Sequence, residues 1–381
     1  MESWRPQVYR AQAPPSVDED VLDNAVAIGS LTASIGSRLP PIFSLRHLAH
    51  YTAANYSILR DIVCRRRVEP YRTFRIQKRS LEGDGRRFRR ICVPEPTLRA
   101  VQQWINRRIL SCAAPHEAST AFAMGSSVKR AAERHCCARW LIKVDLTRFF
   151  ESISEVRVYR VFLSLGYQPL VSLELARLCT RVDPTERSDP HWTARCPTTI
   201  REYVVDYLGH LPQGAPTSPM LANFAMLEFD EKLIELAARY GLQYSRYADD
   251  ITLSTGAREF SYGDAKEIIH LTYSHIGQFG LSPNVAKTSI SPPGARKVVL
   301  GLLVDGPQPR LTRSFRHNLR RHLHYLLNPE VGPSRHAGAR GFTAVAGLKN
   351  HVAGLIAFAH DIDPRFAASC WDQFDRINWP V

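Results

Sequence analysis

The spacing of apolar residues along the chain predicts a mixture of helices and strands. In several stretches the apolar positions recur with the period of one helix face. Leu98, Val101, Trp104 and Ile105, for example, follow this spacing. On this basis helices are predicted at residues 44–67, 98–113, 155–178, 220–240 and 264–279.

Alternating and short apolar segments predict the strands. Residues 71–94 read as a basic two-stranded unit with a glycine-containing turn. Residues 139–144 are a short apolar segment that ends at Asp145, and residues 298–304 give the last clear strand. Residues 181–199 are rich in Pro, Asp, Arg and Ser, which predicts an exposed loop or insertion.

A further helix is predicted near the C-terminal end, and one of its faces is basic. Its apolar face is formed by Phe315, Leu319, Leu323 and Leu326. The opposite face carries Arg313, Arg316 and Arg320. These arginines could simply be solvated, or they could bind the phosphates of a nucleic acid, and because acidic residues are scarce in this segment both readings stay open.

The net charge of the chain favours a polyanionic partner. Across 381 residues, 50 Lys and Arg face 36 Asp and Glu, which gives a net charge of +14. Such a balance fits either nucleic acid or an acidic membrane surface. We find no apolar run long enough to span a bilayer and no leader pattern in residues 1–20, so we expect a cytoplasmic protein that binds nucleic acid and does not bind a membrane.

The eight cysteines do not suggest a metal site or a disulfide framework. They are scattered, and none forms a Cys-x-x-Cys pair. We therefore expect reduced thiols that pack as small apolar side chains.

Three separated motifs carry candidate chemistry. The first is IKVDLTRFF, residues 142–150, a strand that delivers Asp145 with two aromatic residues beyond it. The second is LPQGAPTSP, residues 211–219, a rigid turn that opens a helix. The third is YADD, residues 247–250, on the turn of a predicted hairpin. Each alone has an ordinary explanation, as a helix cap, a linker and a solvated turn.

Taken in order, the three motifs resemble the palm of a reverse transcriptase, and most closely the bacterial enzymes of retrons and related defence systems. The resemblance runs from about residue 74 to about residue 325. It implies an α+β, right-hand polymerase fold: an N-terminal extension at 1–43, fingers at 44–138, a palm with an antiparallel sheet at 139–293, and a small helical thumb at 294–381. Residues 155–205 would then return partly to the fingers.

The same resemblance implies a metal site made of oxygen ligands. Asp145, Asp249 and Asp250 match the carboxylates that hold the metal and carry out catalysis, and the backbone carbonyl of Leu146 joins them. Two divalent ions can clamp the attacking and leaving oxygens of nucleotidyl transfer. Mg²⁺ suits such hard ligands, and Mn²⁺ is a plausible substitute. The metal would also offset the repulsion between the adjacent carboxylates of the turn.

Other positions match residues that bind the incoming nucleotide in this family. They are Lys78, Arg89, Phe150, Gln213, Gly214 and Lys287. Lys78 and Arg89 correspond to cations that grip the triphosphate, with Arg90 as an adjacent competitor. A bulky side chain at Phe150 would collide with a ribose 2′-hydroxyl and select deoxynucleotides, whereas its plainer reading is core packing.

The resemblance implies an RNA-directed DNA polymerase that copies a cognate structured noncoding RNA. In the retron version the product is a single-stranded DNA linked to RNA, made in antiphage defence with a separately encoded effector as a further partner. Two departures weaken the retron assignment: Leu300 stands where retron enzymes commonly have Thr, and the Asn-Ala-x-x-His signature is missing. Alternatives are a non-retron defence reverse transcriptase, an RNA-binding scaffold for a toxic effector, an RNA-dependent RNA polymerase and a group II intron enzyme.

Overall fold

A computed structural model describes residues 4–66, 69–77, 88–182 and 208–380 of the chain. Helices and strands are mixed along these residues, as the apolar pattern predicts. Lys78 and all but the first two residues of the predicted loop at 181–199 lie outside the described residues.

Four helices precede the first strand. They are α1 (Pro6–Gln12), α2 (Glu19–Ile35), α3 (Leu45–Thr52) and α4 (Tyr56–Val63). The prediction of a single helix at 44–67 is therefore wrong in one respect, because this segment forms two helices, α3 and α4. Ala53 adopts a left-handed conformation with a φ of 51°, and Asn55 caps α4 by accepting from the backbone N–H groups of Ser57 and Ile58.

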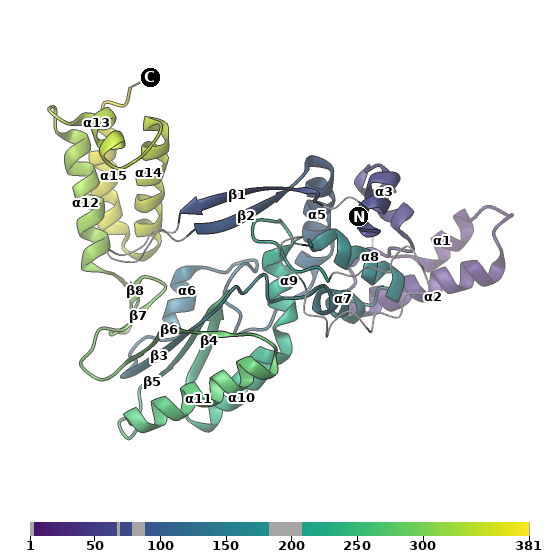
Figure 1. The fold of residues 1–381 in the computed structure, drawn as a ribbon, viewed down its shortest axis with the longest axis horizontal. Coiled ribbons are helices and arrows are strands. Elements are labelled where there is room, and N and C mark those ends of the chain that lie inside the picture. Colours follow the sequence, from purple (N-terminus) through teal and green to yellow (C-terminus); the bar gives the residue numbers. More distant parts are fainter. Residues whose placement is uncertain (1–3, 67–68, 78–87, 183–207, 381) are drawn as a thin grey trace.

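A two-stranded hairpin follows, as predicted from the basic segment. Strands β1 (Tyr71–Gln77) and β2 (Phe88–Pro94) pair antiparallel and project from the helices as an arm (Figure 1). After β2 come α5 (Pro96–Arg108), the short 3-10 helix η1 (Leu110–Cys112) and α6 (Val128–Glu133). The helix predicted at 98–113 thus ends in a tighter 3-10 turn.

A four-stranded antiparallel sheet lies at the centre of the chain. Its strands are β3 (Trp140–Leu146), β4 (Gln243–Tyr247), β5 (Asp250–Thr255) and β6 (Pro283–Ser291), in the order β4-β5-β3-β6. Helices α7 (Glu155–Ser164), α8 (Pro169–Cys179) and α9 (Ser218–Ala225) connect β3 to α10 (Leu227–Arg239), and α11 (Tyr262–Gln278) connects β5 to β6. Figure 1 shows α10 and α11 covering one face of the sheet.

The predicted helix at 220–240 is also divided in two. Met226 separates α9 from α10 with a φ of −101° and a ψ of 7°, and its side chain is fully buried. Apolar spacing continues through this residue, so the pattern alone gives no sign of the break.

The C-terminal part contains a small sheet and four helices. The sheet consists of β7 (Val298–Val299), β8 (Leu302–Leu303) and β9 (Arg310–Leu311), and the helices are α12 (Arg313–Leu327), α13 (Gly332–Ala339), α14 (Val345–Ile362) and α15 (Pro364–Asp375). The strand predicted at 298–304 is a tight hairpin, because Leu300 and Gly301 both have positive φ, 49° and 84°. Such a pair is typical of a two-residue turn.

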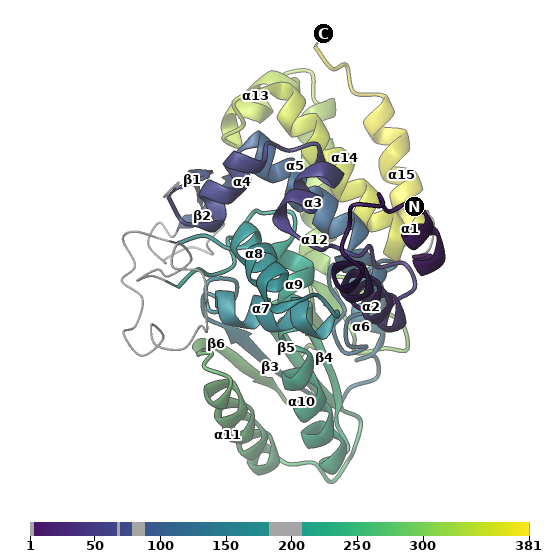
Figure 2. The same cartoon turned by 90° about the vertical axis from the view of Figure 1, so that its right-hand side faces the viewer.

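Two hydrophobic cores stabilise the described residues. One runs from Leu39 to Leu281 and joins α3, α4, the hairpin and the central sheet. The other is built almost entirely from residues of the C-terminal part, with Leu141 of β3 included. Figure 2 shows the helices α12, α14 and α15 of this part side by side. None of the described helices has the length and apolar character that crossing a membrane requires.

Candidate active site

The register of the central sheet brings the predicted carboxylates together. Asp145 on β3 lies opposite Asp250 on β5, and on its other side it lies opposite Asn284 on β6. Asp249 occupies the two-residue turn between β4 and β5 together with Ala248, whose φ is 56°. The prediction that both acidic residues lie on the turn is thus half right, because Asp250 already begins β5.

A cavity of about 610 Å³ opens over this point of the sheet. Its lining includes eight of the residues singled out by the motifs: Arg89, Asp145, Leu146, Phe150, Gln213, Asp249, Asp250 and Lys287. Phe149 and Phe150 both line the cavity, but Phe150 is partly exposed and Phe149 is a buried residue of the core. Leu300, at the turn of the β7-β8 hairpin, lines the same cavity.

Two side chains hold the carboxylate of Asp145. Lys287 Nζ lies 2.9 Å from Oδ1 and 3.0 Å from Oδ2, and Asn284 Nδ2 donates to Oδ2 at 3.0 Å. Asn284 is a site residue that the sequence motifs do not include. It could have been suspected only from the register of β6, which places it beside Asp145.

The remaining two carboxylates are poorly neutralised. Burial raises the pKa of Asp249 above its ordinary value, and the neighbouring Asp145 adds to that rise. Burial also raises the pKa of Asp250, with Asp249 and Asp145 contributing. A bound cation would oppose both shifts.

The donor set fits divalent ions bound jointly with substrate. Among the described residues, no group of three or more His, Cys, Asp or Glu side chains is gathered as a ready cage. Mg²⁺ is commonly held by one or two carboxylates together with substrate phosphates and water, so a cage is not required. The ion pair between the Lys287 ammonium and Asp145 shows that the carboxylates attract positive charge at this position.

A buried ion pair supports the turn that carries Asp249. Arg246 and Asp230 have fully buried side chains, and the Arg246 guanidinium contacts both carboxylate oxygens at 2.8 and 2.6 Å. Arg246 also donates to the carbonyl of Ala248 at 3.1 Å, and Tyr244 donates to Asp230 at 2.6 Å. The guanidinium therefore links α10 directly to the turn between β4 and β5.

The Gln213-Gly214 turn packs against the β1-β2 hairpin. The backbone N–H of Cys92 donates to the Gln213 carbonyl at 2.7 Å. Gly214 has a φ of 110°, and a Cβ at this position would lie 2.8 Å from a side-chain carbon of Ile91. Gly214 does not line the cavity, and the structure places it as a point of close backbone approach.

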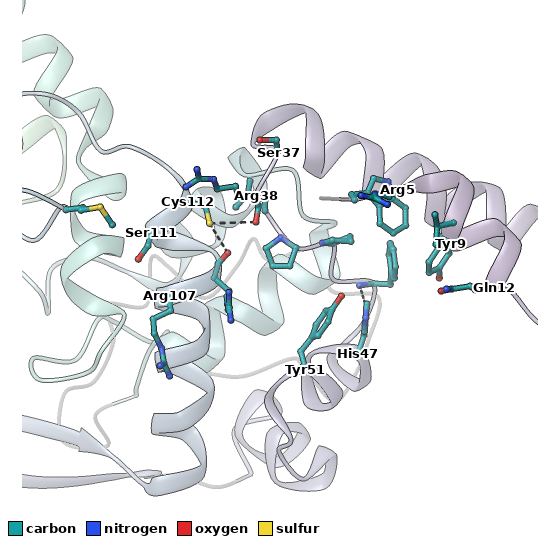
Figure 3. Close-up of a pocket in the computed structure, with 18 residues that line it drawn as sticks. Arg5, Tyr9, Gln12, Ser37, Arg38, His47, Tyr51, Arg107, Ser111 and Cys112 are labelled. Carbon is teal, nitrogen blue, oxygen red and sulfur yellow. Dashed lines mark hydrogen bonds between the residues drawn. The ribbon is translucent and has the colours of Figure 1, made fainter. Parts of the chain in front are cut away.

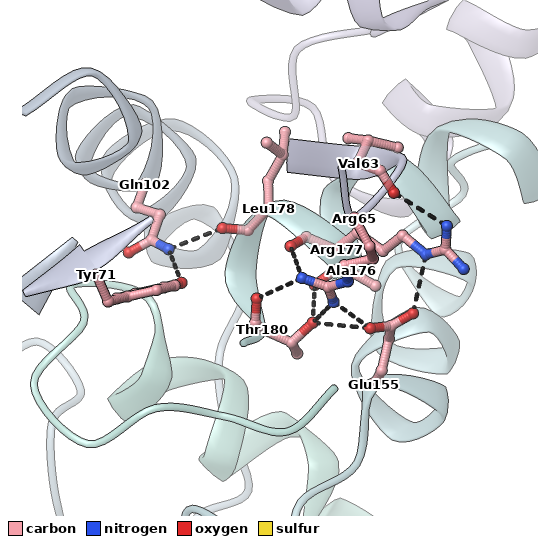
Figure 4. A network of polar contacts seen from close by, with 9 residues as sticks. All are labelled: Val63, Arg65, Tyr71, Gln102, Glu155, Ala176, Arg177, Leu178 and Thr180. Carbon is pink, nitrogen blue, oxygen red and sulfur yellow. Dashed lines mark hydrogen bonds and ion pairs between the residues drawn. The ribbon is translucent and has the colours of Figure 1, made fainter. Parts of the chain in front are cut away.

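A second polar network lies behind the hairpin (Figure 4). Glu155, at the start of α7, forms ion pairs with Arg65 and with Arg177, the latter at 3.0 Å. Arg177 also donates to the carbonyl of Val63, and Arg65 donates to Thr180. These bonds tie α4, α7 and α8 together beside the hairpin, and no motif in the sequence indicated them.

The three arginines predicted to bind nucleic acid lie on α12, and two of them have partners within the chain. Arg316 pairs with Asp363 at 2.5 Å, and the guanidinium groups of Arg316 and Arg320 lie 4.8 and 5.4 Å from the ring centre of Phe366. Arg313 is exposed at the start of the helix. The basic face therefore also helps to attach α15 to α12.

Comparisons with known proteins agree with the geometry. Residues 76–304 match the family described as reverse transcriptase (RNA-dependent DNA polymerase). The chain is 28% identical over 327 residues to the retron Ec86 reverse transcriptase of Escherichia coli, covering 86% of this chain and 87% of that protein. It is 31% identical over 324 residues to the retron Mx65 reverse transcriptase of Myxococcus xanthus, covering 82% of this chain but only 65% of that protein.

The chain was also compared with solved structures. A telomerase from Candida albicans has a TM-score of 0.39 and 11% identity to this chain, over 85% of this chain and 60% of that chain. The similarity to retron proteins is therefore carried by the sequence comparisons.

Proposed function

The chain belongs to the reverse transcriptase family, as a retron-type member and an RNA-directed DNA polymerase, and from that premise we propose that it copies a cognate structured noncoding RNA into DNA. The observation that carries the proposal is the sheet register, because it sets Asp145 beside Asp250 and next to the Asp249 turn over one cavity. We assign residues 44–138 to the fingers, 139–293 to the palm and 294–381 to the thumb of a right-hand polymerase.

The enzymes of this family use divalent metal ions, and we propose two Mg²⁺ ions, with Mn²⁺ able to replace them. Asp145, Asp249, Asp250 and the Leu146 carbonyl would hold them. The ions supply charge stabilisation for the attacking and leaving oxygens. A cation bound beside Asp249 and Asp250 would lower their raised pKa values. Both carboxylates would then be ionised, which is the form that binds a metal ion.

The chain's own side chains select and orient the nucleotide. Arg89 and Lys287 line the cavity and provide positive charge for a triphosphate. Phe150 reaches the same cavity from the segment that follows β3, where its ring would exclude a 2′-hydroxyl. Gln213 lines the cavity on the turn before α9, and Gly214 lets that turn lie against β2.

The retron relatives favour a product linked to RNA. We propose that the chain makes a single-stranded DNA joined to its RNA template in antiphage defence, in the cytoplasm and together with a separately encoded effector. A net charge of +14 suits the RNA and hybrid partners of this activity.

Primer extension tests the polymerase activity. Purified protein with an RNA template, an annealed primer, deoxynucleotides and Mg²⁺ should make DNA, and Asp249→Asn should lower the rate by about 100- to 1,000-fold. Asp372→Asn, an exposed carboxylate on α15, is the matched control and should keep the rate. Equal rates for wild type and Asp249→Asn would refute the proposed site.

Sequencing the nucleic acid that copurifies with the protein, after separate RNase and DNase treatment, tests the product. A short DNA joined to a structured RNA supports the retron product. DNA without a covalent RNA joint favours another defence reverse transcriptase, and RNA without any DNA favours a binding scaffold.

A further inference from the structure

A second cavity, larger than the one over the carboxylates, lies where the N-terminal helices meet α3 and α5. Its volume is about 860 Å³, and it shares no lining residue with the first cavity. Figure 3 shows Tyr9 and Gln12 on one side of it, Arg107 and Ser111 on the opposite side, and His47 and Tyr51 between them. The volume lies within the range of about 300–1,000 Å³ that is typical of small-ligand sites.

The charged side chains that line this second cavity are all basic. Four arginines line it: Arg5, Arg38, Arg107 and Arg108. Among the described residues that line it, none carries a carboxylate. Arg38, Arg107 and Arg108 are exposed, so their guanidinium groups can reach an anionic ligand. The lining thus favours a ligand that carries negative charge.

Aromatic rings form the other part of the lining. The rings of Phe43 and His47 are stacked at 5.3 Å between centroids, and those of His47 and Tyr51 at 4.4 Å. Tyr9 packs against Phe43 at 5.5 Å and is itself only partly buried. Burial, together with His50, lowers the pKa of His47, which keeps its ring uncharged at neutral pH. Tyr51 stacks in turn on Trp104 at 5.4 Å, and Trp4 packs against Tyr9 and Phe43. Apart from Trp104, the partly exposed surfaces of these rings line the cavity, where a further flat ring can pack against them.

These two features together fit an unpaired nucleotide. Its base can stack on the rings while its phosphates meet the arginines, which is how single-stranded nucleic acid is held by proteins that bind it. A duplex keeps its bases stacked inside, so it could not present them to a concave cavity. An acidic peptide would use the arginines but would leave the rings without a partner.

A short segment connects the two cavities along the chain. Phe122 lines the cavity over the carboxylates, and Met124, only two residues further on, lines the second cavity with 97% of its surface exposed. A strand held in the first cavity can therefore continue over this segment to the second. This favours a nucleotide within a strand over a free nucleotide.

We propose that the cavity between α1, α3 and α5 binds an unpaired segment of single-stranded RNA, with the Tyr9, Phe43 and His47 rings stacking a base and Arg38 and Arg108 contacting phosphates. We choose RNA on the strength of the proposed function, whereas the site itself lies outside the polymerase cavity and is formed largely by residues 4–51 and 107–112.

The test measures binding of a short single-stranded RNA to the full chain in EDTA, where polymerisation cannot proceed. The double variant Arg38→Ala/Arg108→Ala should bind about tenfold or more weakly, and the slope of log affinity against log salt should flatten by about 1.4. The matched control, Arg99→Ala/Arg239→Ala, removes the same charge from exposed positions outside the cavity and should change neither quantity as much.

Tyr9→Leu separates stacking from charge. It keeps every arginine and should weaken binding by about fivefold or more while leaving the salt slope unchanged. Thermal unfolding of each variant shows whether the N-terminal helices remain packed. An affinity equal to wild type in both the double variant and Tyr9→Leu would overturn the proposal.

Photocrosslinking locates the RNA without any substitution in the protein. RNA containing 4-thiouridine should crosslink to peptides from residues 4–51 or 107–112. Crosslinks confined to peptides of the polymerase cavity or of α12 would overturn the second site. Primer extension on the same preparation tests the proposed function separately. If wild-type protein made no DNA, the proposed function would fail, whereas the RNA binding measured in EDTA would be unaffected.

Discussion

The guanidinium of Arg246 and the carboxylate of Asp230 form a bidentate ion pair with no solvent exposure, directly behind the turn that carries Asp249. Arg246 is also the largest fully buried side chain among the described residues. Its backbone bonds to Ala118 and Thr120, so the same residue joins the segment after η1 to β4. The pair is therefore a structural support for the site and does not reach the cavity itself.

Removing one partner of this pair should be costly. Asp230→Ala leaves the Arg246 guanidinium buried and uncompensated, and we expect a loss of about 3–5 kcal/mol in the free energy of unfolding. Arg66→Met breaks an exposed pair with Asp61 at 3.7 Å and should cost less than about 1 kcal/mol. Denaturant unfolding measures both, and equal losses would contradict this account.

The Glu155 network should make stability depend on acid pH. Burial by itself would raise the pKa of Glu155, but Arg65 and Arg177 outweigh it and hold the pKa below its ordinary value. The unfolded carboxyl therefore protonates first as the pH falls. The stabilisation is complete above the unfolded value of about 4.3 and is lost as the pH falls through the lower, folded-state pKa.

Glu155→Gln should remove that acid dependence and also lower stability at neutral pH by about 3–5 kcal/mol, because the buried guanidinium of Arg177 and the partly buried one of Arg65 lose their counter-charge. Glu235→Gln, on the exposed side of α10, is the matched control and should leave both quantities near wild type. Unfolding midpoints measured between pH 3 and pH 7 decide the matter. An unchanged acid profile in Glu155→Gln would show that other carboxyls govern it.

Phe150 should control the choice between deoxynucleotides and ribonucleotides. Replacing its ring by Ala opens space in the cavity and should reduce discrimination against ribonucleotides by about 10–200-fold. Single-nucleotide incorporation with each sugar measures this ratio. Phe162→Leu, a change at a fully buried ring outside the cavity, should lower stability and leave the ratio intact. An unchanged ratio in Phe150→Ala would place the sugar gate elsewhere.

The arginines of α12 should contribute differently to RNA binding and to stability. If Arg313 and Arg320 contact phosphates, replacing them by Ala should flatten the salt slope by about 0.9 for each contact with a duplex. Arg316→Ala should lower stability by at most about 1 kcal/mol, since its pair with Asp363 is partly exposed. A salt slope that does not change when Arg313, Arg316 and Arg320 are all replaced by Ala would show that this face does not contact phosphates.

The sequence was sufficient for the carboxylates because each of them lies within a local pattern. Asp145 follows a short apolar strand, and Asp249 and Asp250 interrupt an alternating hairpin, so their elements could be predicted from neighbours in the chain. The partners of these residues could not. Asn284 lies 139 residues from Asp145, and only the pairing of β3 with β6 brings the two together.

The helix boundaries show a second limit. The breaks occur at Ala53 and Met226, residue types with high helix propensity, so neither residue type predicts a break. At the first break Ala53 adopts a left-handed conformation without being glycine, and Asn55 caps the next helix. At the second break Met226 is fully buried, which indicates that packing contributes. Gly214 illustrates the same point, because the motif predicts a place beside the nucleotide and gives no sign that Gly214 also brings two backbone segments into contact.

The bond from the Cys92 N–H to the Gln213 carbonyl joins two main-chain groups. Every amino acid except proline can supply the donor, and any residue can supply the acceptor. Substitutions that change only side chains therefore leave this hydrogen bond between the hairpin and the Gln213-Gly214 turn available. An evolving chain could exchange most of the residues around this joint and still keep the two segments in contact.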